Sequence, residues 1–131
     1  MIVVDASVVA PALADDGSDG AAARRRLRGE RLMAPALLDL EVLSVWRRQR
    51  AGGALDEARA AAALQSLLDL PLTRVEVRPV LGRCWELRHV LTVYAASYVA
   101  LAETLGLTLV TADRRLSGAP GLRWSIEVLA G

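Results

Sequence analysis

Short apolar runs alternate along the chain with longer stretches in which apolar residues recur every three to four positions. The first pattern is typical of buried strands and the second of amphipathic helices. Strands are predicted over residues 1–4, 32–34, 74–80, 107–113 and 123–129. Helices are predicted over residues 8–14, 21–30, 36–50, 56–70, 81–91 and 93–106, the first capped by Ser7 and the third opened by Pro35.

This alternation predicts a three-layer α/β/α fold, in which a mostly parallel sheet is covered by helices on both faces. The chain has 131 residues, enough for one core with little left for a second. It contains no internal repeat, low-complexity tract or linker. We therefore expect a single domain over residues 1–131.

The composition of the chain limits the classes of protein to which it can belong. Hydrophobic residues make up 53% of the chain and charged residues 24%, as in globular proteins, and no apolar run is long enough for a membrane helix. Cys84 is the single cysteine, so no internal disulfide forms and the cytoplasm is the expected compartment. All sixteen basic residues are arginine, a composition that a codon bias also produces. The absence of lysine excludes mechanisms that need a lysine side chain.

Two acids end predicted strands. Asp5 follows the first strand and Asp113 ends the fourth, with Ser7 and Thr111 close to them in sequence. The carboxyl ends of parallel strands share one edge of the sheet, where ligands bind, so both carboxylates are expected there. Either acid alone is equally well explained as a cap of the following helix or turn.

Glu41 is a third acid in an unusual place. In the predicted helix 36–50 it shares a side with Leu37, Leu38 and Val45. An acid among core-facing leucines is costly to bury unless it is paired or bound to a metal. An ion pair with Arg48 or another arginine is the alternative.

Three carboxylates, one histidine (His89) and one cysteine favour a hard cation such as Mg²⁺ or Mn²⁺ over zinc. Such an ion activates water and neutralises charge at a phosphate. Other acid-based sites do not fit. A receiver domain needs a lysine, a phosphatase of the DxD type needs an acid where Ser7 stands, and His89 alone forms no triad.

The segments MIVVDAS, APALLDLEVLSVWRR and WELRHVLTVYAASYVALAETLGLTLVTADRRL together resemble the PIN-domain toxins of the VapC type over nearly the whole chain. The resemblance implies a Mg²⁺- or Mn²⁺-dependent endoribonuclease that cuts structured RNA, such as tRNA or ribosomal RNA, and so stops translation. It also implies a homodimer and a small VapB antitoxin as partner.

Carried over by motif, Asp5, Glu41 and Asp113 match the first, second and fourth acids of the family site. The third acid belongs in the segment VYAASYVALAE, where this chain has Ala95. The missing carboxylate predicts weak or absent metal binding and a strongly impaired enzyme. Because the rest of the site motif is intact, one deliberate acid-to-alanine change is a better explanation than natural decay.

Several arginines are candidates for RNA contact. Arg114 and Arg115 follow Asp113 directly, and the stretch 24–31 reads either as a phosphate-binding track or as a solvated helix face. The aromatic residues of the predicted helices are expected in the core or at a dimer contact; these are Trp46, Trp85, Tyr94 and Tyr98.

Three functions remain open from sequence. The first is a toxin endoribonuclease in an inactivated form, and the second is a non-catalytic PIN module that binds RNA or antitoxin. The third is a metal-dependent DNase of the same fold. Restoring an acid at position 95 and supplying RNA and DNA separates them.

Overall fold

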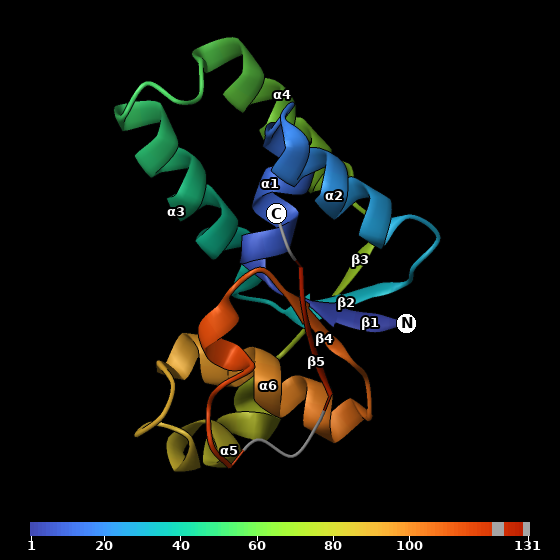
Figure 1. Cartoon of the computed structure of the whole chain (residues 1–131), viewed down its shortest axis with the longest axis vertical. Helices are drawn as coiled ribbons and strands as arrows, with labels where there is room; N and C mark the ends of the chain where they lie inside the picture. Colours follow the sequence, from blue (N-terminus) through green and yellow to red (C-terminus); the bar gives the residue numbers. More distant parts are fainter. Residues whose placement is uncertain (122–124, 130–131) are drawn as a thin grey trace.

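The computed structural model describes residues 1–121 and 125–129. Five parallel strands form one sheet in the order β3-β2-β1-β4-β5 (Figure 1). The strands are β1 (Ile2–Val4), β2 (Leu32–Pro35), β3 (Leu72–Val75), β4 (Leu109–Thr111) and β5 (Ile126–Val128). The α/β fold class predicted from sequence is confirmed.

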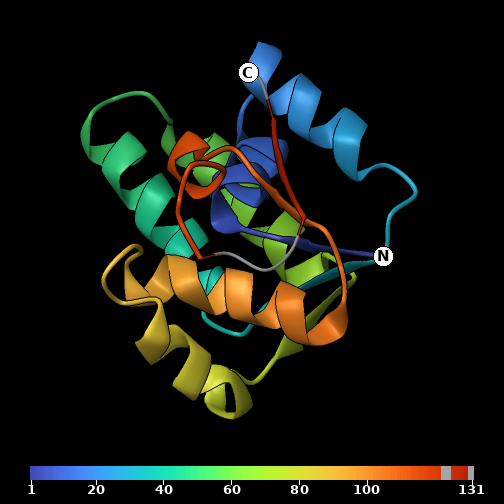
Figure 2. The same cartoon turned by 60° about the horizontal axis from the view of Figure 1, so that its bottom comes forward.

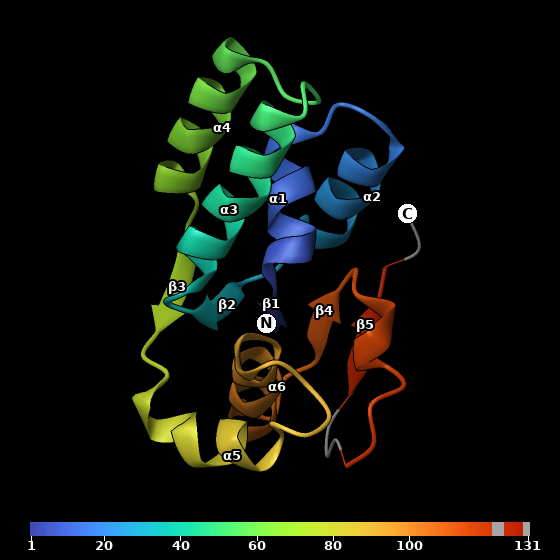
Figure 3. The same ribbon diagram turned by 90° about the vertical axis from the view of Figure 1, so that its left-hand side faces the viewer.

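Helices cover both faces of this sheet. The helices are α1 (Ala6–Ala14), α2 (Ser18–Leu27), α3 (Leu38–Ala51), α4 (Glu57–Asp69), α5 (Leu81–Glu86) and α6 (Val93–Leu105). In Figures 1 and 3, α1 to α4 lie on one side of the strands, and α5 and α6 lie on the other. Figure 2 shows α6 crossing the sheet, and this helix contacts β1, β2 and β4.

Strand β1 and helix α6 form the centre of the core. All three residues of β1 are buried, as expected for a central strand covered on both faces. Every residue of α6 from Ala96 to Ala102 is also buried, and three of these seven are alanines. Small side chains let this helix pack closely on the strands, which brings its first turn to the sheet's carboxyl edge.

The starts of α1 and α3 differ from the sequence prediction. Asp5, not Ser7, caps α1, because its backbone is extended and its carboxylate accepts the Ser7 amide. Pro35 does not open a helix; it is the last residue of β2, in register with Val75 of β3, and α3 begins at Leu38. The sequence around Pro35 fits both roles, and strand pairing decides between them.

Helix α2 begins at Ser18, inside the segment predicted as a loop. Gly20 is buried there against the backbone of Asp15, so closely that a Cβ at position 20 would lie 1.9 Å from the Asp15 carbonyl oxygen. The Asp15 carboxylate in turn accepts the Gly20 amide at 2.7 Å. A glycine that reads as a loop signal is required here for close packing.

The predicted helix 81–91 is shorter than expected, since α5 ends at Glu86. The chain then turns, and the amides of Val90 and Leu91 both donate to the Leu87 carbonyl at 3.0 Å. The predicted strand 74–80 also divides, into the end of β3 and a 3₁₀ turn at Arg78–Val80. Arg123 and Trp124, predicted to begin the last strand, lie outside the described residues.

The aromatic residues divide into two groups. Trp46 and Tyr98 are buried, which agrees with a core role, whereas Trp85 and Tyr94 are 63% and 60% exposed. The Trp46 indole donates to the Ala10 carbonyl at 3.2 Å and so ties α3 to α1. Among the helices in the described part of the chain, none has the length and apolar character needed to span a bilayer.

Trp46→Phe should lower the free energy of unfolding by about 1–2 kcal/mol, because it removes a buried hydrogen bond and leaves unfilled volume. Urea unfolding followed by circular dichroism measures this. The matched control, Trp85→Phe at an exposed position, should change stability by less than about 0.5 kcal/mol. Equal losses in the two variants would contradict the packing described for Trp46.

Candidate active site

The strand order places a crevice between β1 and β4. From β1 the chain proceeds to β2 on one side, and β4 pairs with β1 on the other side. The chain therefore leaves the carboxyl end of β1 toward one edge of the sheet and the carboxyl end of β4 toward the other. Open α/β sheets bind ligands in the crevice between two such strands. Asp5 directly follows β1, and Asp113 comes two residues after β4.

A cleft of about 340 Å³ opens at this edge, and we call it the acid cleft. It is lined by residues from α1, α3, α6 and the loop after β4. Those that carry the argument are Asp5, Ser7, Glu41, Arg48, Thr92, Ala95, Tyr98, Asp113 and Arg115. The four acid positions assigned to one site from sequence thus line one cleft together with Ser7, whereas Thr111 does not line it; the roles of these residues in binding and catalysis stay predictions.

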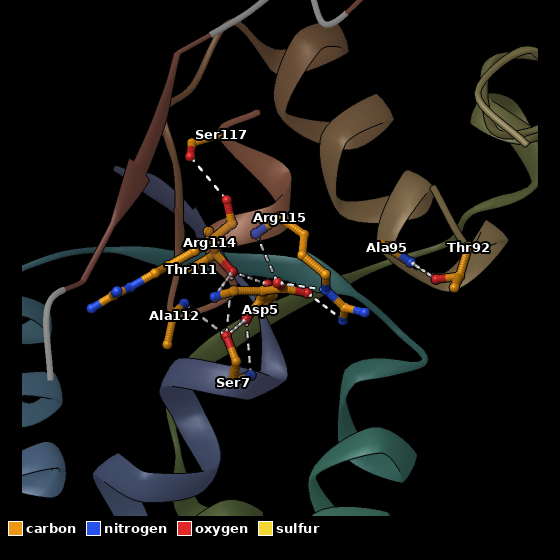
Figure 4. Close-up of polar contacts among 10 residues, drawn as sticks. Asp5, Ser7, Thr92, Ala95, Thr111, Ala112, Arg114, Arg115 and Ser117 are labelled. Atoms are coloured by element: carbon orange, nitrogen blue, oxygen red, sulfur yellow. Dashed lines mark hydrogen bonds and ion pairs between the residues drawn. The ribbon is translucent and has the colours of Figure 1, made fainter. Parts of the chain in front are cut away.

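Asp5 is held by two hydroxyl groups (Figure 4). The Ser7 amide and hydroxyl both donate to one carboxylate oxygen, the amide at 2.8 Å. The Thr111 hydroxyl donates to the other oxygen. Each hydroxyl also accepts a backbone amide from the loop after β4, Ala112 on Ser7 at 2.8 Å and Asp113 on Thr111 at 3.0 Å. This network fixes the carboxylate and joins the ends of β1 and β4.

The charge of Asp5 is nevertheless unfavourable in this position. The side chain is buried, and in residues 1–121 and 125–129 it makes no ion pair. Burial raises its pKa above the ordinary value, and repulsion from Asp113 adds to that rise, whereas the hydrogen bonds from Ser7 and Thr111 oppose it. A buried carboxylate with donors but no cation is suited to receive one.

Glu41 points into the same cleft from the first turn of α3. Its carboxylate accepts a short hydrogen bond from the Tyr98 hydroxyl of α6. Burial, followed by repulsion from Asp5, raises the pKa of Glu41, and the Tyr98 bond lowers it. The ion pair with Arg48 considered from sequence does not form, because Arg48 donates to Ser44 instead.

Asp113 forms an ion pair with an arginine of its own loop. The Arg115 guanidinium donates to both carboxylate oxygens, at 3.0 and 2.8 Å, and holds the pKa of Asp113 below its usual range. Figure 4 shows the Arg115 side chain extending toward the side on which Thr92 and Ala95 lie. Arg114 lines a different cavity, between α1, α2 and α3, so the structure separates the two arginines that sequence reasoning grouped.

Ala95 lies at the third position of α6, and its amide donates to the capping Thr92 hydroxyl at 3.1 Å. Acidic side chains are favoured at this position by the helix dipole and by capping geometry. The first turn of α6 nevertheless contains no acid. An acid at position 95 therefore fits the helix and would enter the acid cleft, to which alanine brings no donor.

Tyr98 is the site residue that sequence reasoning did not assign, since it was expected only in the core or at a dimer contact. Its phenol is buried yet hydrogen-bonded to Glu41. Its pKa is raised well above the ordinary value by burial and then by that bond, so the phenol stays a donor. In the sequence, its position one helical turn after Ala95 indicates that both side chains lie on the same face of the helix.

The basic stretch 24–31 is partly used within the fold. Arg24 donates to the backbone carbonyls of Ala12 and Asp15, and Arg26 pairs with Glu30 and Glu127. These contacts stabilise α2 and β5, which weakens the interpretation of the whole stretch as a phosphate track.

A family model for the PIN domain matches residues 2–122. The chain belongs to the PIN-domain family. It is 47% identical over 129 residues to ribonuclease VapC9 of Mycobacterium tuberculosis, with 98% of each chain covered. It is 38% identical over 130 residues to ribonuclease VapC12 of the same species, with 99% of this chain and 100% of that one covered. It is thus a homologue of the VapC ribonuclease toxins.

Solved structures agree with this PIN fold. The crystal structure of VapC20 of Mycobacterium tuberculosis, described as a sarcin–ricin loop cleaving toxin, superposes with a TM-score of 0.70. It covers 94% of this chain and 97% of its own at 20% identity, which supports the fold alone. PAE2754 from Pyrobaculum aerophilum gives a TM-score of 0.66 at 29% identity, with 89% and 84% covered.

PIN nucleases generally use Mg²⁺. Oxygen donors of the right kind line the acid cleft, and Asp5 lacks a cationic partner, so the chemistry of the donors fits a hard cation. However, the described residues contain no group of three or more histidine, cysteine or acidic side chains arranged to hold an ion. Two reasons are visible: Asp113 is turned to Arg115, and position 95 has no carboxylate.

The raised pKa of Asp5 predicts a pH dependence of stability. Because the folded protein keeps this proton to higher pH than the unfolded chain, the contribution is fully present below the ordinary value of 3.8 and is lost as pH rises through the raised pKa. In EDTA, the melting temperature of the parent minus that of Asp5→Asn should therefore fall between about pH 4 and about pH 7. A difference that is constant or grows with pH would show that burial does not destabilise this charge.

The Tyr98–Glu41 bond should be measurable as a coupling. A double-mutant cycle with Tyr98→Phe and Glu41→Ala at neutral pH is expected to give about 1 kcal/mol, the usual size for such a hydrogen bond, because each substitution removes one partner of the bond. Tyr94→Phe, at an exposed tyrosine of the same helix, is the control and should change stability by less than about 0.5 kcal/mol. Additive effects of the two substitutions would mean that the bond contributes nothing in solution.

Proposed function

We propose that this chain, as a single PIN domain over residues 1–131, is a divalent-metal-dependent endoribonuclease toxin whose activity is strongly impaired because Ala95 replaces an acid. The observation that carries the proposal is the buried carboxylate of Asp5, which pairs with no arginine in residues 1–121 and 125–129, in a cleft that Ala95 also lines. The proposed substrates are structured RNAs, such as tRNA or ribosomal RNA, as the resemblance to the VapC type implies.

In this proposal Asp5 would hold the metal, and Glu41 and Asp113 would orient water beside it. When bound, Mg²⁺ or Mn²⁺ supplies an activated water and positive charge at the phosphate. Ser7 and Thr111 fix the orientation of the Asp5 carboxylate, and Tyr98 fixes that of Glu41. Arg48 lines the cleft and would place further positive charge near a bound phosphodiester, whereas the charge of Arg115 is offset by Asp113.

The change at position 95 is confined to one side chain. Asp5, Glu41 and Asp113 keep the carboxylates that the family resemblance assigns to them, and the hydroxyl network around Asp5 is complete. A decaying site would lose such contacts together. A single substitution that inactivates the toxin explains the pattern better.

A non-catalytic PIN module that binds RNA or antitoxin is the second candidate. It is favoured by the absence, in the described part of the chain, of acidic side chains grouped to hold a metal. A DNase of the same fold uses the same carboxylates and differs only in substrate. One variant at position 95 separates these functions.

Ala95→Asp should convert the chain into a ribonuclease that is active with Mn²⁺ or Mg²⁺ and inhibited by EDTA. The expected gain is roughly a thousandfold in rate, equivalent to about 4 kcal/mol of barrier, from a second carboxylate at the metal. Cleavage of total RNA, with single- and double-stranded DNA in parallel, measures it.

Ala95→Asn is the matched control, because it has nearly the shape of the aspartate variant without the charge and should stay inactive. A folded Ala95→Asp protein that cuts neither nucleic acid would favour the binding module. Cleavage of DNA but not RNA would favour the DNase.

We further propose a homodimer and a cognate VapB-type antitoxin in the cytoplasm. Exposed apolar side chains on α3 and α6 support a dimer, since Leu40 and Tyr94 are each more than half exposed. Light scattering at micromolar concentration should give twice the chain mass of 14.0 kDa. A monomer that persists as the concentration is raised would argue against this assembly.

A further inference from the structure

A second cavity of about 430 Å³ lies beside the acid cleft and shares part of its wall. Thr92, Ala95 and Asp113 are among the residues that line both. The rest of its lining comes from the turn between α5 and α6, above all Arg88, and we call the cavity the Arg88 pocket. A chain-like ligand that lies in the acid cleft can therefore continue into this pocket.

The Arg88 side chain is fixed from two directions. Its guanidinium carbon lies 4.3 Å from the centroid of the Trp85 ring, a cation–π contact, and one of its nitrogens donates to the Trp85 carbonyl at 2.7 Å. The turn below it is closed by the amides of Val90 and Leu91 on the carbonyl of Leu87, whose side chain is buried. A guanidinium has five donors, so most of those of Arg88 stay available to a ligand.

The rest of the lining combines one available cation with apolar and polar surface. Arg88 contributes the positive charge, because Arg115 is paired with Asp113, the single carboxylate on the wall. Val90 and Leu91 provide apolar surface beside it, and His89 provides a polar ring. A forked cation next to an apolar wall suits a phosphate joined to a flat base.

We propose that the Arg88 pocket binds the nucleotide adjacent to the scissile phosphate of an RNA substrate. Arg88, held by Trp85, binds its phosphate, and the apolar wall of Val90 and Leu91 receives its base. This inference rests on the proposed function. It states where the RNA lies on one side of the scissile phosphate. It also gives a role to Trp85, a large aromatic side chain that the fold leaves exposed.

The present chain suits a binding measurement because, under the proposed function, the missing carboxylate at position 95 keeps it from cutting the RNA efficiently. Fluorescence anisotropy with a short fluorescein-labelled single-stranded RNA of mixed sequence measures Kd over a series of salt concentrations. Arg88→Gln should raise Kd about tenfold at low salt and reduce the slope of log Kd against log salt by about 0.7, the loss of one phosphate contact.

Arg78→Gln is the matched control. Arg78 is exposed in the 3₁₀ turn Arg78–Val80 and lines neither cavity. Its substitution should leave Kd within about twofold. Equal losses for Arg78 and Arg88 would mean diffuse electrostatic binding and would overturn the pocket assignment.

A second arm tests the role of Trp85. Trp85→Ala removes the ring under Arg88 and should weaken RNA binding, and Trp85→Phe should recover part of the loss because a ring face returns. The double variant Trp85→Ala with Arg88→Gln should bind no more weakly than Arg88→Gln alone. Additive losses would show that Trp85 acts independently of Arg88.

Cleavage by the Ala95→Asp variant distinguishes a failure of the pocket assignment from a failure of the proposed nuclease function. If that variant cuts RNA and Arg88→Gln leaves both binding and cleavage unchanged, the pocket assignment is wrong and the nuclease stands. If Ala95→Asp neither binds nor cuts RNA, the proposed function fails, and the pocket assignment fails with it.

Discussion

The buried carboxylate of Asp5 determines how the rest of the site is built. It is 7% exposed, and its hydrogen-bond donors are the hydroxyls of Ser7 and Thr111 with one backbone amide. Because those hydroxyls also accept amides from the loop after β4, the two central strands are joined by the same contacts that hold the charge. Removing the charge or a hydroxyl therefore affects the edge of the sheet and the cleft together.

The other two acids are kept apart by partners of their own. Tyr98 holds Glu41 on one wall, and Arg115 holds Asp113 on the other. The small residues of α6 let the first turn of that helix reach the cleft, with Ala95 at a helix position that favours an acid. The fold thus presents a place for one more carboxylate and, beyond it, the Arg88 pocket for a substrate that extends from the cleft.

Most of the fold was predictable because β-branched runs and helical periodicity are local signals. The shared edge of Asp5 and Asp113 was also predictable, because parallel strands align their carboxyl ends. What sequence missed depends on partners distant in the chain. Pro35 is in a strand because β3 pairs with it, and Tyr98 is a site residue because Glu41 faces it from another helix. No local pattern encodes the pairing of Pro35 with β3, and the position of Tyr98 one helical turn after Ala95 indicates a shared face but not the contact with Glu41.

The central claim is that the acid cleft is a metal site lacking one ligand at position 95. The most direct test is anomalous diffraction from crystals of the parent chain and of Ala95→Asp, each soaked in Mn²⁺ under the same conditions. We expect a strong manganese peak within bonding distance of the Asp5 carboxylate in the variant, and a weak peak or none there in the parent. Peaks of equal strength in both, or a peak away from Asp5 in the variant, would contradict the account.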